Sequence, residues 1–338
     1  MRVLSLFDGM ACGYEALLRA WIKVDKYYAS EIDKYAIQIA MKNHPDIIQV
    51  GDVTKLKGED FKDVDMIIGG SPCQGFSMAW KMLNFNDPRS KLFFEFVRLV
   101  KEIKPKYFLL ENVKMKKEFQ DVISEYMWVK PIEINSALLS AQNRKRLYRT
   151  NIPNVSIPED KGIRVKDILE TNVDEKYYLS EAMLNCMMWI NQKPSKYPRG
   201  KRFEQSLRNT NEKWIANCVS THAWSRPVDN FIIEENKILV NWAAIRNQHT
   251  KNWVETQLNI RKDEKSNCVV SSYADKLNQV KIWPRIRKLT PIECERLQTM
   301  PDNYTEWVSD TQRYKMLGNG WTCDVIAHIF SFIKTDNG

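Results

Sequence analysis

Short apolar runs alternate with amphipathic segments through the first half of the chain. Residues 3–7 and 66–69 have the length and composition of buried strands, while residues 34–43 and 92–103 repeat apolar positions at helical spacing. The same pattern predicts further strands at 24–30, 107–110 and 130–135 and further helices at 14–21 and 118–126. Strands that alternate with crossover helices are typical of a parallel sheet. The pattern therefore predicts an α/β fold with a doubly wound sheet.

The regular alternation stops near residue 158. Beyond it, Trp, Asn, Lys and Arg are scattered among short β-like runs, which indicates a second, smaller and irregular β-rich domain. Helical spacing returns at 289–298, with Thr290 as cap and Pro291 in the first turn, and again at 322–333. Because the last helix needs an apolar surface to cover, we expect it to pack back on the first domain. We therefore expect residues 1–158 and 311–338 to form one domain and residues 159–310 the other.

A weak internal repeat lies in the second domain. Residues 217–233 and 267–280 each contain a strand-like run, a polar turn and a second strand-like run. Each copy predicts a hairpin, and chance resemblance between two short β segments is the open alternative.

Composition narrows the class of protein. At about 150 residues per domain, 338 residues suit two domains. No apolar run approaches the roughly 20 residues that span a bilayer, and no cleavable signal is visible, so we expect a cytoplasmic protein without membrane contact. Seven cysteines without a Cys-x-x-Cys pair indicate free thiols rather than disulfides or a zinc site, and we expect no metal. A net charge of +9 suits a polyanionic partner such as nucleic acid.

Residues with binding chemistry follow the predicted strands. A glycine-containing turn at 8–13 follows the first strand, and the amides of such a turn favour electron-rich ligand groups. Glu31 follows the second strand, where a carboxylate either holds a ribose diol or caps a helix. Asp52 follows the third strand. The dinucleotide motif Gly-x-Gly-x-x-Gly is absent, which disfavours a nicotinamide dehydrogenase.

Two later strands end in candidate catalytic residues. Gly69 and Gly70 close one strand, and Pro72 stiffens the turn that presents Cys73 at the carboxyl edge of the sheet. An exposed thiol in such a turn is expected of a nucleophile, whereas a small buried cysteine is the alternative. Glu111 follows the next strand, and a carboxyl group at the same edge can share or donate a proton.

A third candidate group has period-two spacing. Gln142, Arg144 and Arg146 would face one way if they lie on a strand. Two guanidiniums on one face require acidic side chains, phosphate or a polarised carbonyl oxygen as partners.

Six motifs in chain order resemble those of the DNA cytosine-5 methyltransferases, and together they cover the whole chain. They are Phe7-x-Gly9, Pro72-Cys73-Gln74, Glu111-Asn112-Val113, Gln142-x-Arg144-x-Arg146, the segment 287–298 and Gly318-Asn319-Gly320. The turn at 7–14 also resembles the animal de novo branch, whereas residues 176–181 are similar to bacterial and phage members. The resemblance implies a bacterial or phage enzyme with a Rossmann-like methyltransferase sheet and a target-recognition region at about 190–284.

The resemblance implies S-adenosylmethionine as the cofactor. Phe7 would lie against it, Glu31 would bind the ribose hydroxyls, and Asp52 would accept a hydrogen bond from the adenine amino group. The residues expected to contact it are Phe7, Asp8, Gly9, Met10, Glu31, Ile32, Asp52, Val53, Pro72, Leu92, Asn319 and Trp321. The chain departs from bacterial members at Asp8, Ala11 and Cys12, where alanine and two glycines are common, and at Gly320-Trp321, which replaces Ser-Val.

Covalent catalysis on a cytosine in double-stranded DNA is also implied. The Cys73 thiolate would attack carbon 6, Glu111 would hydrogen bond to or protonate ring N3, and Arg144 would polarise the carbonyl oxygen. Gln142 and Arg146 would belong to the same catalytic site. Because a duplex hides the target carbon, the cytosine must be flipped out.

Segments 77–89 and 193–203 and the turns of the two repeats are expected to contact the DNA. The polar segment 77–89 would close over the duplex, with an ordinary surface loop as the alternative. Segment 193–203 interleaves five positive charges with aromatic residues and suits phosphate contacts, with a solvated basic loop as the alternative. The turns of the two repeats would read base edges. The expected DNA-binding residues are Ser77, Trp80, Lys81, Arg89, Lys196, Arg199, Lys201, Arg202, Ser220, Arg226, Ser271 and Lys276.

We expect the enzyme to act on DNA as a monomer, with a cognate restriction endonuclease as a candidate partner. Two other functions stay open. An RNA cytosine methyltransferase shares the Pro-Cys-Gln and Glu-Asn-Val motifs, but the Cys-Phe-Thr element of the transfer-RNA enzymes is absent. A catalytically silent DNA-binding regulator would keep the fold, although Cys73, Glu111 and Arg144 are intact.

Overall fold

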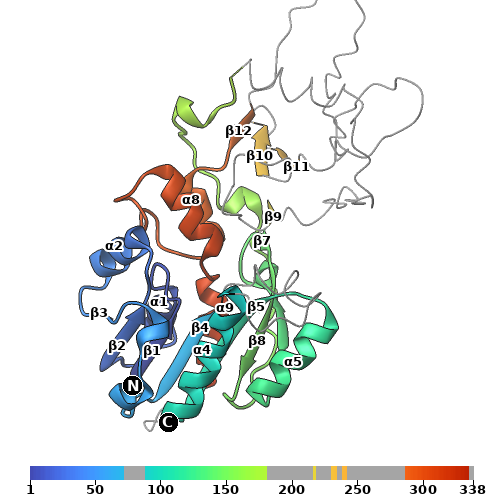
Figure 1. Ribbon diagram of the computed structural model, residues 1–338. Coiled ribbons are helices and arrows are strands. Elements are labelled where there is room, and N and C mark those ends of the chain that lie inside the picture. The colour runs from blue at the N-terminus through green and yellow to red at the C-terminus, as the bar shows by residue number, and fades with distance from the viewer. Residues whose placement is uncertain (72–87, 181–215, 218–229, 234–237, 242–285, 335–338) are drawn as a thin grey trace, which may run out of the picture.

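The computed structural model describes residues 1–71, 88–180, 216–217, 230–233, 238–241 and 286–334. Its main feature is a seven-stranded sheet with helices on both faces (Figure 1). In spatial order the strands are β3 (Ile48–Gln49), β2 (Lys26–Ser30), β1 (Arg2–Leu6), β4 (Met66–Gly70), β5 (Tyr107–Val113), β8 (Lys145–Thr150) and β6 (Ile132–Asn135). The predicted α/β class and doubly wound sheet are confirmed.

One strand departs from the parallel arrangement that the sequence predicts. β8 runs antiparallel to both of its neighbours, β5 and β6, whereas the other neighbouring pairs of the sheet are parallel. β8 therefore returns the chain to the edge where β5 begins, and its first residues lie beside the end of β5.

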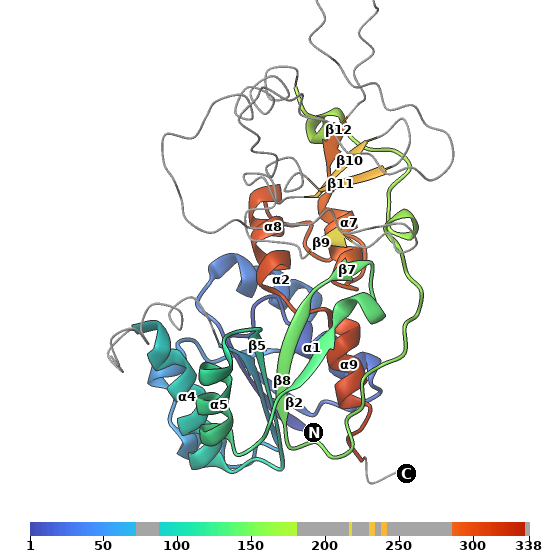
Figure 2. The same ribbon diagram turned by 90° about the vertical axis from the view of Figure 1, so that its right-hand side faces the viewer.

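Each face of the sheet has its own hydrophobic core, because alternate strand residues point to opposite faces. In β4, Met66 and Ile68 pack on one face and Ile67 on the other. The helices of the first face are α1 (Cys12–Arg19), α2 (Lys34–Asn43) and α9 (Cys323–Phe330), and those of the second are α4 (Pro88–Ile103) and α5 (Lys117–Met127), as Figure 2 shows. Among the described residues, no helix combines the length and apolar character that crossing a membrane requires.

The C-terminal part of the chain packs against the beginning of the sheet. Leu297 at the end of α7 (Pro291–Leu297) and Tyr314 in α8 (Asp310–Asn319) belong to the same core as Val3. The helices predicted at 289–298 and 322–333 are confirmed as α7 and α9 (Cys323–Phe330). Thr290 caps α7, since its Oγ1 accepts a hydrogen bond from the Glu293 amide at 3.1 Å. The last helix, α9, packs on α1 as expected.

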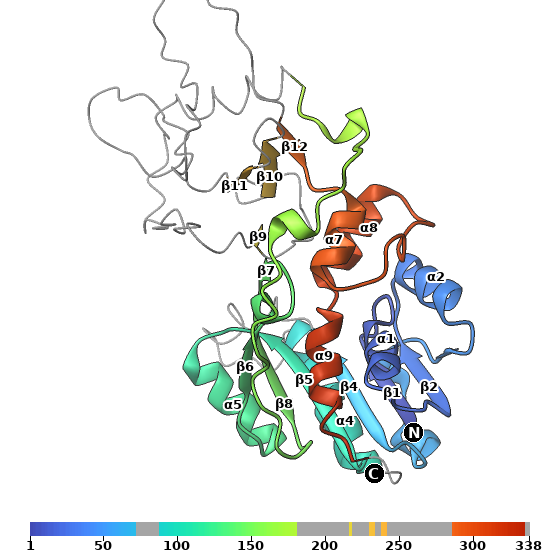
Figure 3. The same ribbon diagram turned by 180° about the vertical axis from the view of Figure 1, so that it is seen from behind.

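The smaller strands pair differently from the predicted repeat (Figure 3). β10 (Asn230–Ile233) lies between β11 (Ile238–Asn241) and β12 (Ile286–Lys288) in an antiparallel sheet, whereas β9 (Ala216–Asn217) pairs with β7 (Gln142–Asn143). The hairpin expected at 217–233 is therefore wrong, because its two strands lie in different sheets. An alternating pattern identifies a strand but not its partner. The second copy, at 267–280, lies outside the described residues.

Candidate active site

The turn between β1 and α1 has a strained backbone. Phe7, Gly9 and Ala11 have φ angles of +58°, +64° and +65°, in the left-handed region that favours glycine. Strain of about 1–3 kcal/mol at each of the two non-glycine positions is typical of ligand-binding sites. No atom lies within 4 Å of a Cβ built on Gly9. The turn that the sequence predicts as a binding element is therefore open beside Gly9.

Glu31 connects this turn to the end of β2 through hydrogen bonds. Its Oε2 accepts a hydrogen bond from the Gly9 amide at 2.8 Å, and its Oε1 accepts from the amides of Ile32 at 2.7 Å and Asp33 at 2.8 Å. A carboxylate has about four acceptor positions, so one position stays available for a ligand hydroxyl. The neighbouring Ile32 side chain is 78% exposed. An acceptor beside an open apolar surface fits the ribose and adenine of S-adenosylmethionine.

Asp8 is buried beneath the same turn. Tyr27 Oη donates to Asp8 Oδ1 at 2.7 Å, while Oδ2 has no hydrogen-bond partner among the residues that the structure describes. Burial raises the pKa of this carboxyl group to about 7. The departure from alanine at this position therefore introduces a group that titrates near neutral pH below the turn, where a cationic ligand would favour its ionised form.

Other residues expected to contact the cofactor are less open. Asp52 Oδ1 accepts a hydrogen bond from the Thr54 amide at 3.0 Å and so caps a short helix, which lowers the pKa of Asp52. Val53 is buried in the core and Leu92 is half-buried against it. The side chain of Asp52 is thus half-buried and already used as a helix cap, whereas the side chain of Val53 packs inward.

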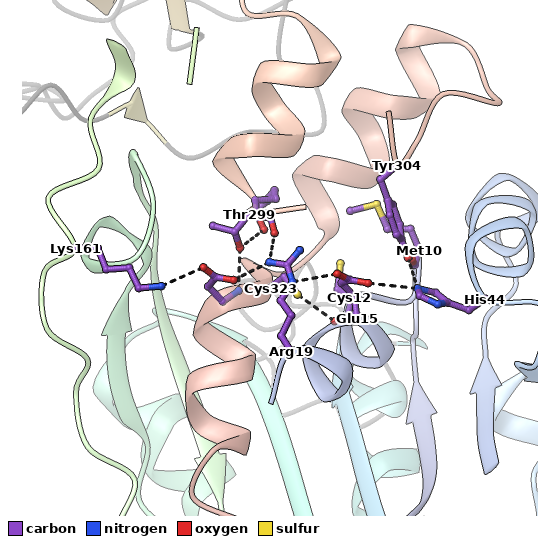
Figure 4. A network of polar contacts seen from close by, with 11 residues as sticks. Met10, Cys12, Glu15, Arg19, His44, Lys161, Thr299, Tyr304 and Cys323 are labelled. Atoms are coloured by element: carbon purple, nitrogen blue, oxygen red, sulfur yellow. Dashed lines mark hydrogen bonds and ion pairs between the residues drawn. The ribbon is translucent and has the colours of Figure 1, made fainter. Parts of the chain in front are cut away.

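A chain of polar contacts holds the turn from its C-terminal side (Figure 4). Tyr304 Oη donates to the Met10 carbonyl at 2.8 Å and lies 3.0 Å from His44 Nε2. Because the only phenol proton goes to a carbonyl, His44 Nε2 must be the donor in the second contact. Glu15 Oε2 lies 3.8 Å from the same nitrogen, and Glu15 Oε1 accepts from Arg19 Nε at 3.0 Å. Tyr304, which no sequence motif marks as a site residue, therefore connects the turn to α1 and α2.

β5 and β8 bring a carboxylate and a guanidinium together at the same edge of the sheet. Arg146 Nε lies 3.0 Å from Glu111 Oε1, and the two side chains are only 14% and 11% exposed. A Cβ built on Gly70 would lie 3.0 Å from Glu111 Oε2 and 2.9 Å from Trp321 Nε1. The missing side chain of Gly70 therefore lets the end of β4 lie close to both groups.

Trp321 lies between the cofactor turn and Glu111. Its ring is 3.5 Å from the position that a Cβ on Gly13 would take, and its indole nitrogen lies near Gly70. Trp321 is half-buried, whereas Asn319, at the end of α8, is exposed. One indole side chain thus borders both predicted parts of the site.

Gln142 and Arg144 point toward the C-terminal helices. Gln142 Nε2 donates to Gln298 Oε1 at 3.2 Å, and Arg144 Nη2 donates to the carbonyls of Gly318 at 3.2 Å and Gly320 at 2.8 Å. The strand expected to carry this motif is interrupted, because β7 ends before Arg144 and β8 begins after it. Main-chain carbonyls therefore accept hydrogen bonds from the Arg144 guanidinium, whereas the Arg146 guanidinium pairs with the Glu111 carboxylate.

Many predicted contacts lie outside the described residues, so their roles stay predictions. The chain enters the segment that contains Cys73 from Ser71, whose Oγ accepts a hydrogen bond from Asn112 Nδ2 at 3.3 Å, beside Glu111. Arg89 lies in the first turn of α4. Outside the described residues are Pro72, Cys73, Ser77, Trp80, Lys81, Lys196, Arg199, Lys201, Arg202, Ser220, Arg226, Ser271 and Lys276.

Known proteins resemble the chain over nearly its whole length. A family model described as C-5 cytosine-specific DNA methylase matches residues 1–335. The chain is 32% identical to the type II methyltransferase M1.ScrFI of Lactococcus lactis subsp. cremoris, over 94% of this chain and 74% of that protein. It is 26% identical to the orphan methyltransferase M.SPRI of Bacillus phage SPR, over 98% and 96% of the two chains.

The fold is also similar to solved structures. The Entamoeba histolytica methyltransferase EhMeth has a TM-score of 0.68 at 18% identity, with 98% of this chain and 97% of that chain covered. A putative DNA modification methyltransferase encoded within an Escherichia coli prophage has a TM-score of 0.57 at 23% identity, with 98% of each chain covered. The resemblance drawn from the six motifs is confirmed, and with it the cofactor that the family uses. The chain therefore belongs to the C-5 cytosine-specific DNA methylases and is an S-adenosylmethionine-dependent DNA cytosine-5 methyltransferase.

Proposed function

We propose that this enzyme methylates a cytosine flipped out of double-stranded DNA at a specific sequence, through a covalent Cys73 intermediate. The observation that carries the proposal is the sheltered Glu111–Arg146 pair beside Gly70 and Trp321. Cys73 follows three residues after Gly70, the last residue of β4. When bound, S-adenosylmethionine supplies an electrophilic methyl group on a sulfonium.

Cys73 is assigned the role of nucleophile. Attack of its thiolate on carbon 6 breaks the 5,6 double bond and leaves electron density at carbon 5, which can then take a methyl group. Loss of the carbon-5 proton and expulsion of the Cys73 thiolate restore the ring. Glu111 donates a hydrogen bond or a proton to N3, which offsets the negative charge that the attack places on the ring.

Arg146 is assigned to the cytosine carbonyl oxygen in place of Arg144. N3 and the carbonyl carbon are adjacent atoms of the ring, so the groups that bind N3 and the carbonyl oxygen must lie side by side. Arg146 Nε is 3.0 Å from Glu111, whereas Arg144 Nη2 donates to the Gly318 and Gly320 carbonyls. This assignment replaces the role that the sequence suggested for Arg144.

DNA recognition is assigned to two regions whose roles rest on the sequence. Segment 77–89 would close over the duplex, where flipping the base costs a few kcal/mol. The region at about 190–284 of the smaller domain (159–310) would read the target sequence, while residues 1–158 and 311–338 would carry catalysis. β9 and β10 do not form a hairpin, so no hairpin turn lies between them. Residues 218–229, which connect the two strands, would instead be the first segment that reads the target sequence. Lys196, Arg199, Lys201 and Arg202 would contact phosphates.

The setting of this reaction is also a proposal. Relatives of the chain are named type II and orphan methyltransferases, so a cognate restriction endonuclease is a proposed partner. A DNA substrate and bacterial and phage relatives favour the cytoplasm of a bacterial or phage-infected cell. We propose that one chain acts on one DNA site as a monomer.

The proposed function is tested by methyl transfer to DNA and RNA, followed by methylation profiling on a duplex library with randomised sites. DNA should be methylated at one sequence class and RNA should not. Substitutions within 220–229 and within 271–276 should relax preference at different positions of that sequence, by about 1–3 kcal/mol for each lost bidentate base contact. Unchanged preference in folded variants of either segment would remove it from target recognition, and methylation of RNA alone would overturn the proposed substrate.

Glu31→Ala should weaken binding of S-adenosylhomocysteine by about 1–3 kcal/mol, because a ribose hydroxyl and the Gly9 amide both lose their acceptor. Calorimetry measures this loss. Asp33→Ala is a matched control in the same connection, since Asp33 Oδ1 accepts from the Tyr35 amide at 3.0 Å and caps α2. The control should lower the thermal stability of the enzyme without weakening its binding of S-adenosylhomocysteine. Equal loss of affinity in both variants would contradict a direct role for Glu31.

A further inference from the structure

Gln298 is a fully buried residue at the C-terminal end of α7, and its amide group is saturated with hydrogen bonds. Its Nε2 donates to the carbonyls of Leu317 at 2.5 Å and Gly320 at 3.4 Å. Its Oε1 accepts from Gln142 Nε2 at 3.2 Å and Thr322 Oγ1 at 2.9 Å. An amide side chain has two donors and two acceptor positions, so all four are used.

These partners belong to two different parts of the site. Gln142 lies in the motif that continues to Arg146, the partner of Glu111. Leu317 and Gly320 lie at the end of α8 and in the turn that leads to Trp321. Gln298 therefore connects the strand beside the proposed cytosine pocket with the turn beside the proposed cofactor pocket.

Arg144 makes the same connection from the other side. It is 4% exposed, and its Nη2 donates to the Gly318 and Gly320 carbonyls. The Gly320 carbonyl thus accepts from both Arg144 and Gln298. A Cβ on Gly320 would lie 3.0 Å from Met10 Cε and 3.3 Å from Cys12 Sγ, so the turn is also packed against the β1–α1 connection.

We propose that Gln298 is a positioning residue that couples cofactor binding to binding of the target cytosine. Displacement of Trp321 by a bound cofactor would move the Gly320 carbonyl, and the shared hydrogen bonds would transmit that movement to Gln142 and Arg144. An unpaired polar group is costly in a buried network, so movement of one group requires its partners to adjust. The proposal rests on the proposed roles of Trp321, Glu111 and Arg146.

Gln298→Met tests this coupling, because methionine has a similar length but cannot form the four hydrogen bonds. The variant is expected to fold, since Gln142 Nε2 also donates to the Leu297 carbonyl at 2.9 Å and Thr322 Oγ1 also contacts Ser136 Oγ at 2.8 Å. Calorimetry would measure S-adenosylhomocysteine binding with and without a duplex that carries the methylated sequence. In the native enzyme the duplex should tighten binding at least about fivefold, and in the variant less than about twofold.

Thr305→Val is the matched control. Thr305 is fully buried in the same C-terminal segment, and its Oγ1 accepts from Arg313 Nε at 2.9 Å, away from the Gly320 turn. This variant should lose thermal stability and keep the native coupling. Native coupling in folded Gln298→Met, an equal loss in the control, or no coupling in the native enzyme would overturn the proposal.

A milder variant keeps the test decisive if Gln298→Met does not fold. Thr322→Val removes one of the four bonds to Gln298, and Thr322 makes no side-chain capping bond to α9. It should reduce the coupling by an intermediate factor, and unchanged coupling would again overturn the proposal. Failure of the native enzyme to methylate DNA is a separate result, which would count against the proposed function instead.

Discussion

Cys73→Ser should abolish methyl transfer, with a loss on the order of 10⁴-fold or more in single-turnover rate, because a serine hydroxyl is far less nucleophilic than a thiolate. The same substitution should abolish covalent trapping on duplexes that carry 5-fluorocytosine at the target position. Fluorine cannot leave carbon 5 as a cation, so the native enzyme should stay attached to such DNA. Denaturing gel electrophoresis of enzyme, cofactor and duplex measures the trapped fraction.

Cys294→Ala is the matched control for this experiment. Cys294 lies in α7, is buried, and has a thiol pKa raised well above its ordinary value by burial, so it has little thiolate character at neutral pH. The control should be trapped like the native enzyme. Binding of S-adenosylhomocysteine and DNA should survive in Cys73→Ser, and trapping of that variant would place the nucleophile elsewhere in the chain.

Glu111→Gln should lower the single-turnover rate by about 10²–10⁴-fold, the range expected for removal of a general acid. The amide keeps the shape of the side chain and can still hydrogen bond to N3, but it cannot transfer a proton. Rapid-quench measurement of methyl transfer, with enzyme in excess of DNA, isolates the chemical step.

Glu133→Gln provides the comparison for Glu111. Glu133 lies on β6 opposite Leu147 and pairs with Lys114 Nζ at 2.7 Å, but it is 35% exposed, whereas Glu111 is 11% exposed. Loss of the Glu133 carboxylate should keep the single-turnover rate within about twofold of the native rate, as expected for a surface ion pair. A Glu111→Gln enzyme with a native chemical rate would show that proton transfer to N3 is not required of this side chain.

The elements that the sequence predicts well are those with no charged residue at a buried position. Residues 34–43 form α2 with the predicted bounds, and β4 extends the expected strand by one residue. α8 was missed because one of its buried residues is Arg313, whose Nη2 donates to the buried Glu295 Oε1 at 2.9 Å. A charged residue on a buried face removes the helical pattern of apolar positions on which such predictions depend.

β8 was missed for a similar reason. Arg149 has no exposed surface, and its guanidinium donates to Asn112 Oδ1 at 3.2 Å and to the Gln120 carbonyl at 2.8 Å. Sequence alternation treats arginine as a surface residue, so the strand looks polar on both faces. Partners that lie about 30 to 40 positions away, such as these, cannot be found from local spacing.

In the candidate site too, residues with a local sequence pattern were found and residues that act through distant partners were missed. Glu31 follows β2 and Glu111 lies near the end of β5, so a carboxyl-edge rule is enough to find both. Arg146, at the start of the antiparallel β8, was found instead by its period-two spacing and its motif. Tyr304 and Gln298 were missed as site residues because they act through the Met10 and Gly320 carbonyls, which have no sequence signature. Gln298 was nevertheless part of the motif at 287–298, so its place in that motif was the available signal.

The packing of α9 on α1 has a consequence for synthesis of the protein. Arg19 and Asp324 are 305 positions apart, and at about 5–20 residues per second the ribosome needs about 15–60 s to make the chain between them. Ala16 and Leu17 of α1 are fully buried in the finished fold, in the core that α9 completes. The nascent chain therefore carries an uncovered apolar helix face through most of its translation, the period in which aggregation competes with folding.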